Sequence, residues 1–408
     1  MGRIELYKDK SDCCGCEACV NICKRNAIKM QEDEYGFLYP QIDSSLCVEC
    51  GQCKKVCSYQ NENTEFNEPL LAEAATVTDR EICLKSASGG IFAALAKKIL
   101  QDGGRVYGCA FIYKDGVLYP EHVRVQSEND LTRLQGSKYV QSKMGSIYKN
   151  VKEDLEEGRV VLFSGTPCQI DALNSYLKNR EKNNLFTVDI ICHGTPSAKL
   201  FAEYLKHIAK NINGKIVDFR FRDKSGGWGL KGSVIYQDKM DKLRKKTLPI
   251  QLSSYYALFL DSETYRENCY SCKYAGKKRI GDITLGDYWG VEDEHPEILA
   301  ENGGRFDKSM GISCVLINTK KGQQLLDCLD EEIERVPSSY EKIAKRNNQL
   351  KCPSSHSNVR DTIFELYKQK GYSAVDQWYF KRLGIKRYAY KLWNYIPRKA
   401  QILIKKII

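Results

Sequence analysis

The spacing of the cysteines constrains this chain more than any other feature of its sequence. Nine of the 18 cysteines lie within residues 13–57, and eight of these form two runs with the pattern C-x2-C-x2-C-x3-C, offset by 34 residues. The two runs are Cys13, Cys16, Cys19, Cys23 and Cys47, Cys50, Cys53, Cys57. A [4Fe-4S] cluster requires four thiolates, and this spacing supplies three from a tight loop and a fourth beyond it. The spacing therefore predicts two [4Fe-4S] clusters.

The fourth cysteine of each run is expected to bind the cluster of the other run. The predicted ligand sets are Cys13, Cys16, Cys19, Cys57 for a first cluster and Cys47, Cys50, Cys53, Cys23 for a second cluster. Zinc is the alternative, but structural zinc sites usually group their ligands as two C-x2-C pairs. The segment resembles the dicluster bacterial-type ferredoxins over about 60 residues, except that Lys24 and Ser58 replace the usual prolines. Cys14 is surplus, and we expect a packed or exposed thiol there rather than a ligand.

Composition places the chain among globular proteins of a reducing compartment. Of its 408 residues, 42% are hydrophobic and 28% are charged, and no apolar run approaches the 18 residues of a membrane span. The first residues lack the apolar stretch of a secretory signal. Without export, cysteines are better interpreted as metal ligands or redox thiols than as disulfides. We therefore expect a cytoplasmic protein, and the secreted, disordered and transmembrane classes are excluded.

The net charge of +11 is concentrated at the C-terminal end. Residues 377–408 contain nine Lys or Arg and no acidic residue, which leaves +2 for the rest, so the charge gives no reason to expect a nucleic-acid partner. Within this tail Ile385, Ala389, Leu392 and Ile396 recur at helical spacing among basic and aromatic residues. This pattern is typical of peripheral contact with the inner face of a membrane. The alternative is a helical cap on the main domain with a solvated basic face.

Beyond the cysteine runs, strand-like and helix-like segments alternate from about residue 70 to residue 335. This alternation favours an α/β (α+β) domain with a mixed sheet, whose loops gather at one edge. We divide the chain into a dicluster domain (1–60), a polar linker (61–71), the α/β domain (72–335) and a C-terminal helical extension (336–408) that is basic and amphipathic from residue 377. The alternation in F-R-F-R-D-K places Arg220 and Arg222 on one strand face, which we expect to be solvated.

Four further cysteines lie in loops of the α/β domain. Cys168 lies at a helix start, where the helix dipole favours the thiolate, and Cys192 directly follows a strand. Loops after neighbouring strands meet at one sheet edge, so Cys168 and Cys192 are expected to lie close together. With the C-x2-C pair Cys269 and Cys272 they could hold a third cluster. Buried structural cysteines, or a redox dithiol at Cys269 and Cys272, are the alternatives.

A short glycine-containing segment precedes an apolar helix. Ser88, Gly89 and Gly90 leave the backbone N–H groups at the helix start open to an approaching phosphate. A flexible helix start without a ligand is the alternative.

Several motifs carry a resemblance that covers residues 72–320. They are K-S-A-S-G-G (85–90), G-C-A-F (108–111), Q-G-S-K-Y-V-Q-S (135–142), G-T-P-C-Q (165–169), I-C-H-G-T-P-S (191–197) and C-Y-S-C-K-Y with R-I-G-D-I-T-L-G-D-Y-W-G (269–290). In this order they resemble the β-subunit family of coenzyme F420 hydrogenases and dehydrogenases, which joins a ferredoxin lobe to a flavin domain.

The resemblance implies FAD with a [4Fe-4S] cluster close to it. Carried onto this chain, it implies a third cluster at Cys168, Cys192, Cys269 and Cys272. It places FAD around Ser88, Gly89, Gly90, Ser137, Lys138, Tyr139, Thr166 and Gln169. Two of the side chains are candidate catalytic groups: His193 could relay a proton, and Lys138 could meet the flavin phosphates or its N1/O2 region. The alternatives are a satisfied loop histidine and a surface lysine.

The combination of cofactors predicts an oxidoreductase. A flavin exchanges two electrons as hydride, whereas each cluster carries one electron. The predicted protein is an iron–sulfur flavoprotein of anaerobic redox metabolism that exchanges electrons between a hydride-level substrate and one-electron carriers. The substrate is a deazaflavin coenzyme or another organic molecule, and the redox partner is a ferredoxin-like protein or an enzyme. The alternative is a non-catalytic electron-transfer subunit that serves a partner enzyme and binds no flavin.

Overall fold

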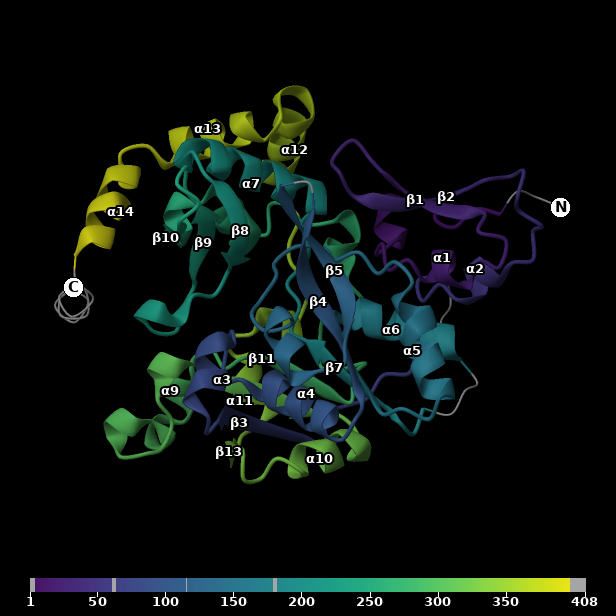
Figure 1. The fold of residues 1–408 in the computed structure, drawn as a ribbon, viewed down its shortest axis with the longest axis horizontal. Helices are drawn as coiled ribbons and strands as arrows, with labels where there is room; N and C mark the ends of the chain where they lie inside the picture. Colours follow the sequence, from purple (N-terminus) through teal and green to yellow (C-terminus); the bar gives the residue numbers. More distant parts are fainter. Residues whose placement is uncertain (1–3, 61–63, 115, 179–181, 397–408) are drawn as a thin grey trace.

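A mixed eight-stranded sheet forms the centre of the molecule (Figure 1). The computed structural model describes residues 4–60, 64–114, 116–178 and 182–396. The strand order is β13-β3-β12-β11-β7-β6-β4-β5, in which β4, β6, β7 and β11 run parallel and the other pairs are antiparallel. The strands are β3 Leu71–Val77, β4 Arg105–Lys114, β5 Val117–Val125, β6 Val161–Gly165, β7 Leu185–Ile190, β11 Ile283–Asp287, β12 Ser313–Ile317 and β13 Ile333–Pro337. The predicted mixed α/β sheet is confirmed.

Helices cover both faces of this sheet because apolar side chains alternate along its strands. In β6, Leu162 packs on the face of α4, whereas Val161 and Phe163 pack on the opposite face, with α5 and α6. The helices that accompany the sheet are α3 Arg80–Lys85, α4 Ile91–Gln101, α5 Ile147–Glu156, α6 Pro167–Leu177, α9 Val291–Glu294, α10 Lys320–Asp327 and α11 Tyr340–Ala344. We call the sheet with these helices the central domain.

The first 60 residues form a small lobe, the dicluster lobe, that lies against α5 and α6 (Figure 1). Its elements are α1 Ala18–Ile22, α2 Gln52–Lys55 and the antiparallel pair β1 Ile28–Glu32 and β2 Leu38–Ile42. Its own apolar cluster is built on only Leu6, Ile28 and Cys53. Such a small core is marginal without further stabilisation. Residues 61–63 of the predicted linker lie outside the described residues, and residues 64–70 contain one isolated bridge, between Asn67 and Arg279.

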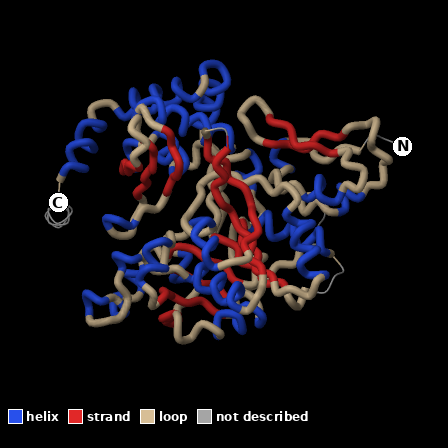
Figure 2. Tube along the Cα trace, in the orientation of Figure 1, coloured by secondary structure: helices blue, strands red, loops and turns tan. Residues whose placement is uncertain are grey.

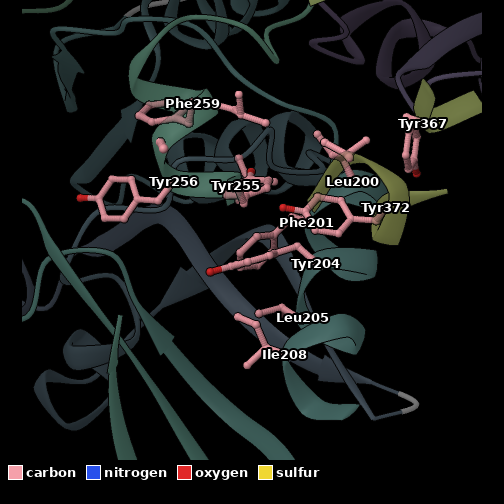
Figure 3. Packing of buried hydrophobic residues seen from close by; sticks show 14 of the residues in the cluster. Leu200, Phe201, Tyr204, Leu205, Ile208, Tyr255, Tyr256, Phe259, Tyr367 and Tyr372 are labelled. Carbon is pink, nitrogen blue, oxygen red and sulfur yellow. The ribbon is translucent and has the colours of Figure 1, made fainter. Parts of the chain in front are cut away.

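A second, three-stranded sheet has the order β10-β9-β8 and packs against helices of the C-terminal region. Its core is aromatic: Phe201 lies 5.3 Å from Phe219 and 5.2 Å from Tyr255 between ring centroids (Figure 3). The elements are β8 Lys215–Arg220, β9 Lys231–Gln237, β10 Leu243–Pro249, α7 Ala198–Ile212, α8 Ser254–Leu260, α12 Asn358–Lys370 and α13 Tyr372–Leu383. The expectation for Arg222 is wrong: Arg220 is exposed, but Arg222 lies beyond the end of β8 and is buried.

Helix α14 (Lys386–Tyr395) extends away from the rest of the molecule (Figure 2). Its predicted apolar stripe is exposed to solvent, with Ile385 84% and Leu392 67% exposed. In the described residues this stripe is therefore not docked on the main domain. The remainder of the predicted tail, 397–408, lies outside the described residues. No described helix is both long and apolar enough to cross a membrane.

Short 3-10 helices complete the structure. They are η1 Lys10–Asp12, η2 Glu128–Arg133, η3 Lys224–Gly226, η4 Ile250–Leu252, η5 Glu267–Ser271, η6 Pro296–Ile298, η7 Ala300–Asn302, η8 Lys308–Met310 and η9 Asn348–Leu350.

Candidate functional site

A cavity of about 320 Å³ opens where the parallel strands β6, β7 and β11 end. Its walls come mainly from residues 86–93, 134–142, 164–169, 188–195 and 268–279. The carboxyl edge of parallel strands is where α/β proteins usually bind ligands, and the volume is in the usual range for such sites. All but one of the residues predicted to contact FAD, and both predicted catalytic residues, line this cavity.

The four loop cysteines also line the cavity. Cys168 lies in the first turn of α6 and Cys192 follows β7, while Cys269 and Cys272 lie on and just after η5. Burial and the neighbouring thiols raise the pKa of Cys192, and the same influences raise the pKa of Cys269 to about 12. The pKa of Cys168 is raised as well, because a hydrogen bond with Cys14 and burial outweigh the helix dipole. The structure thus brings together the four cysteines of the predicted third set.

The dicluster lobe groups its cysteines in two neighbouring sets. Cys13, Cys16, Cys19 and Cys57 surround a small cavity of about 20 Å³. In the second set, Cys53 has Cys47 and Cys50 as charged neighbours, and Cys23 packs in the same apolar cluster as Cys53. Cys50 is exposed. Among the described residues, no three Cys, His, Asp or Glu side chains converge on a single ion position, as a mononuclear zinc site requires.

The surplus thiol of Cys14 is buried between two of these sets. Cys14 lines both the small cavity of the first set and the large cavity of the central domain. Its pKa is raised well above the ordinary value, chiefly by Cys16, and Cys168 is its other thiol partner. Cys14 therefore lies between the first predicted cluster and the predicted third cluster, a position that its place in the sequence does not reveal.

The segment that precedes α4 owes its glycines to close packing. A Cβ on Gly89 would come within 2.4 Å of the Ala75 carbonyl oxygen, and Gly89 packs on β3 and β12 rather than facing the cavity. Gly90 has a φ of +90° and caps α4. The Ser88 hydroxyl donates a hydrogen bond of 2.9 Å to the Ile312 carbonyl oxygen. The backbone at the start of this 11-residue helix is open to the cavity and suits a phosphate group.

Other predicted flavin contacts are also engaged within the protein. The Gln169 side chain accepts a hydrogen bond from the Thr166 backbone nitrogen at 3.0 Å and donates one to the Ser142 hydroxyl at 3.0 Å. The Tyr139 ring stacks on Phe259 at 4.5 Å. These contacts fix the cavity wall, and Ser137 lines the cavity beside Tyr139.

Lys138 is held by the backbone of its own segment. Its ammonium group donates hydrogen bonds of 2.9 Å to the carbonyl oxygens of Arg133 and Gln135. Burial lowers the pKa of Lys138 to about 8. Two of its three N–H groups are therefore occupied, and Lys138 stabilises the turn that forms this part of the wall.

His193 lines the cavity and keeps an exposed side chain. Desolvation by the surrounding protein lowers its pKa, and the charge of Asp287 opposes that effect. A neutral imidazole with solvent access can accept or donate a proton near neutral pH.

Sequence reasoning missed a charged and aromatic cluster beside the cavity. The Arg222 guanidinium pairs with Asp287 and lies 5.4 Å and 5.5 Å from the rings of Trp228 and Trp289. It also donates a hydrogen bond of 3.2 Å to the Tyr139 hydroxyl. Asp287 and Trp289 line the cavity. The alternation that suggested a solvated Arg222 could not show that residues about 65 positions later cover it.

Comparison with known proteins agrees with this organisation. Residues 158–338 match the C-terminal family of the "Coenzyme F420 hydrogenase/dehydrogenase, beta subunit", and residues 12–61 match the "4Fe-4S dicluster domain". The sequence is 24% identical over 352 residues to a coenzyme F420-dependent sulfite reductase from Methanocaldococcus jannaschii. That alignment covers 82% of this chain but 50% of the relative, so the chain spans half the length of the relative.

A solved structure also resembles the chain. It is a chain of the F420-reducing [NiFe] hydrogenase complex from Methanosarcina barkeri, which is 19% identical, with a TM-score of 0.43. The match covers 74% of this chain and 94% of the other.

Proposed function

The chain joins a 4Fe-4S dicluster domain to the C-terminal domain of coenzyme F420 hydrogenase/dehydrogenase beta subunits, and it is an iron–sulfur oxidoreductase of this F420-related group. From this premise we propose that it exchanges electrons between a hydride-level substrate and one-electron carriers through FAD and three [4Fe-4S] clusters. The observation that carries the proposal is that one cavity gathers the four loop cysteines and most of the predicted flavin contacts. The substrate is a deazaflavin of the F420 type, as the relative's name indicates.

The residues of the chain suit these cofactors. Bound FAD would exchange two electrons as hydride and pass them on singly, and each cluster would carry one. The backbone at Gly90 would hold a flavin phosphate at the start of α4. The third cluster would be held by the four loop cysteines, and His193 would exchange the proton that accompanies hydride transfer. The aromatic and apolar walls would exclude water.

The arrangement of the cysteine sets supports an order of electron transfer. The loop cysteines lie at the flavin cavity, and Cys14 connects this region to the first set. Cys19 of the first set has Cys53 of the second set as a charged neighbour. Cys50 of the second set is exposed, beside the exposed Val48. We therefore place the second cluster at the surface, where a ferredoxin-like protein or an enzyme subunit would exchange electrons with it.

Anaerobic purification with counts of iron, sulfide and flavin per chain tests this function. We expect about 12 iron atoms, because three clusters contain four each, together with one FAD. About eight iron atoms would remove the third cluster. Iron without flavin would instead support the second candidate, a non-catalytic electron-transfer subunit. That candidate is favoured by the exposed position of Cys50 alone, since a wiring subunit needs surface clusters but no cavity.

We also propose that α14 makes peripheral contact with the inner face of a membrane. Its exposed Ile385 and Leu392 lie close to the basic residues Lys386, Arg387 and Lys391. Apolar side chains next to basic ones bind the interface of anionic membranes.

A further inference from the structure

Arg266 is a fully buried arginine at the junction of the dicluster lobe and the central domain. Its relative exposure is 0%. The guanidinium donates hydrogen bonds to the carbonyl oxygens of Cys13 at 2.7 Å and Leu38 at 3.0 Å, and to the Gln141 side-chain oxygen at 3.3 Å. It also lies 3.6 Å from the Cys13 thiol. Arg266 therefore touches a predicted ligand of the first cluster directly.

None of these acceptors is a carboxylate, which separates Arg266 from the other buried arginines. Arg222 pairs with Asp287, Arg279 pairs with Asp189, and Arg360 pairs with Glu267. In the described part of the chain, Arg266 pairs with neither an aspartate nor a glutamate. Burial of a charge without a counter-ion costs several kcal/mol. The negative charge that compensates Arg266 must therefore come from another group.

The groups around Arg266 that can carry negative charge are thiols. Its charged neighbours include Cys13, Cys14 and Cys269, which belong to the first set, the bridging position and the cavity set. On the other side, the Tyr39 ring lies 4.0 Å from the guanidinium carbon and excludes water. Gly15 allows the close approach: its φ is +67°, and a Cβ there would come within 3.0 Å of an Arg266 nitrogen.

We propose that Arg266 is the counter-cation of the first cluster and raises its reduction potential. The inference rests on the proposed function, because it requires a [4Fe-4S] cluster at Cys13, Cys16, Cys19 and Cys57. A cluster with four thiolate ligands is negatively charged in both redox states and gains one negative charge on reduction. A fixed cation in a water-free position stabilises the reduced state more than the oxidised state. Hydrogen bonding to the ligand sulfur acts in the same direction.

Arg266 is also a positioning residue between two clusters. Its backbone nitrogen donates a hydrogen bond of 3.0 Å to the Thr195 carbonyl oxygen, and its own carbonyl oxygen accepts one of 3.0 Å from Cys269. Its side chain reaches Cys13 in the other lobe. One residue therefore fixes the first cluster relative to the cavity cysteines, so its charge would favour electron flow from the cavity toward the dicluster lobe.

A redox titration followed by electron paramagnetic resonance tests the charge. The proteins are the anaerobically prepared wild type and the variants Arg266→Gln, Arg266→Lys and Arg360→Gln. Arg360→Gln is the matched control, because it removes a buried arginine that is already paired with Glu267. In Arg266→Gln we expect one cluster to become at least tenfold harder to reduce, a shift of about 59 mV for one electron. Arg266→Lys should fall between this variant and the wild type, and Arg360→Gln should not shift.

Thermal unfolding with and without iron separates a charge effect from a packing effect. If the cluster compensates Arg266, then Arg266→Gln lowers the melting temperature of the iron-loaded protein but does not lower that of the iron-free protein. A packing role alone would lower both.

The outcomes are distinguishable. An iron-loaded Arg266→Gln variant with unchanged potentials would overturn the inference. So would two Arg266 variants that fail to bind iron while Arg360→Gln binds it, because the role of Arg266 would then be structural. A wild-type protein without cluster signals would overturn the proposed function itself, and the inference with it.

Discussion

The carboxylate of Glu17 accepts a hydrogen bond of 2.9 Å from the backbone nitrogen of Met144, across the junction between the dicluster lobe and the central domain. Its second oxygen accepts a hydrogen bond of 3.1 Å from Gly145, and the Asn21 side chain donates one of 2.7 Å to the Gly145 carbonyl oxygen. Glu17 and Asn21 are buried. Polar groups that satisfy one another in a buried junction fix the two parts in one geometry, which the electron route through Cys14 and Arg266 requires.

Replacement of Glu17 tests this junction. In Glu17→Ala, two backbone N–H groups lose their acceptor in a buried site, and each unsatisfied group costs about 1–3 kcal/mol. We expect the iron-loaded protein to lose this much unfolding free energy, measured by urea denaturation, and the lobe to be cleaved faster by protease. The exposed Glu5 of the same lobe provides the control: Glu5→Ala should change neither quantity, and equal losses in both variants would contradict the prediction.

The third cluster is tested by removing half of its predicted ligands. In the double variant Cys269→Ala with Cys272→Ala, we expect the iron content to fall from about 12 to about eight atoms per chain. The control is Cys14→Ala, which removes a buried thiol that is not a predicted ligand and should keep all the iron. A double variant with the iron content of the wild type would show that these cysteines hold no cluster.

The order of elements and the meeting of the loop cysteines follow from local sequence. Alternating strands and helices predict the mixed sheet, and loops that follow neighbouring parallel strands must share an edge, so Cys168 and Cys192 meet as expected. The 2-2-3 spacing predicts the grouping of the lobe cysteines because the ligands lie close in sequence. These features depend on periodicity and spacing, which a sequence displays directly.

The packing between the lobe and the central domain could not be predicted in the same way. Arg266 and Cys13 are 253 residues apart, and nothing local indicates that they touch. Lys138 was expected to face a flavin, but two backbone carbonyls nearby in its own segment bind its ammonium group. In each case the partner of a charged side chain depends on tertiary contacts that no pattern in the sequence encodes.

His193 can be tested as the proton-exchanging group of the cavity. In His193→Gln, we expect the reduction of coenzyme F420 by reduced methyl viologen to slow by about 10²–10⁴-fold, the usual contribution of general acid–base catalysis. Iron and flavin content should not change, because the side chain is exposed and the fold does not depend on it. His356→Gln is the control, since His356 lies 3.5 Å from Asp361 and outside the cavity lining. Equal rates in the wild type and His193→Gln would exclude the role.

The buried His122 predicts a loss of stability in acid. Its ring nitrogens contact the Ser142 hydroxyl at 2.8 Å and the Ser164 carbonyl oxygen at 3.0 Å, and burial lowers its pKa from 6.5 to about 4. Because the unfolded state binds the proton more readily, this contribution is complete above pH 6.5 and is lost as the pH falls toward 4. Between pH 7 and pH 5.5 it amounts to about 1 kcal/mol. Urea denaturation should show this difference in the wild type relative to His122→Gln, and equal pH dependence in both proteins would contradict it.

Helix α14 offers a test of membrane contact with a closely matched control. Leu392 on α14 and Met240 on the turn between β9 and β10 are both 67% exposed, so replacement of either by aspartate changes a surface of equal accessibility. Only Leu392 lies close to Lys386, Arg387 and Lys391, each of which contributes about 1 kcal/mol near an anionic surface. We expect the wild type and Met240→Asp to sediment with vesicles that contain phosphatidylserine but not with neutral vesicles, and Leu392→Asp to remain in the supernatant. Sedimentation that is equal for both variants, or equal for both kinds of vesicle, would mean that α14 serves no membrane and that its apolar stripe requires a protein partner instead.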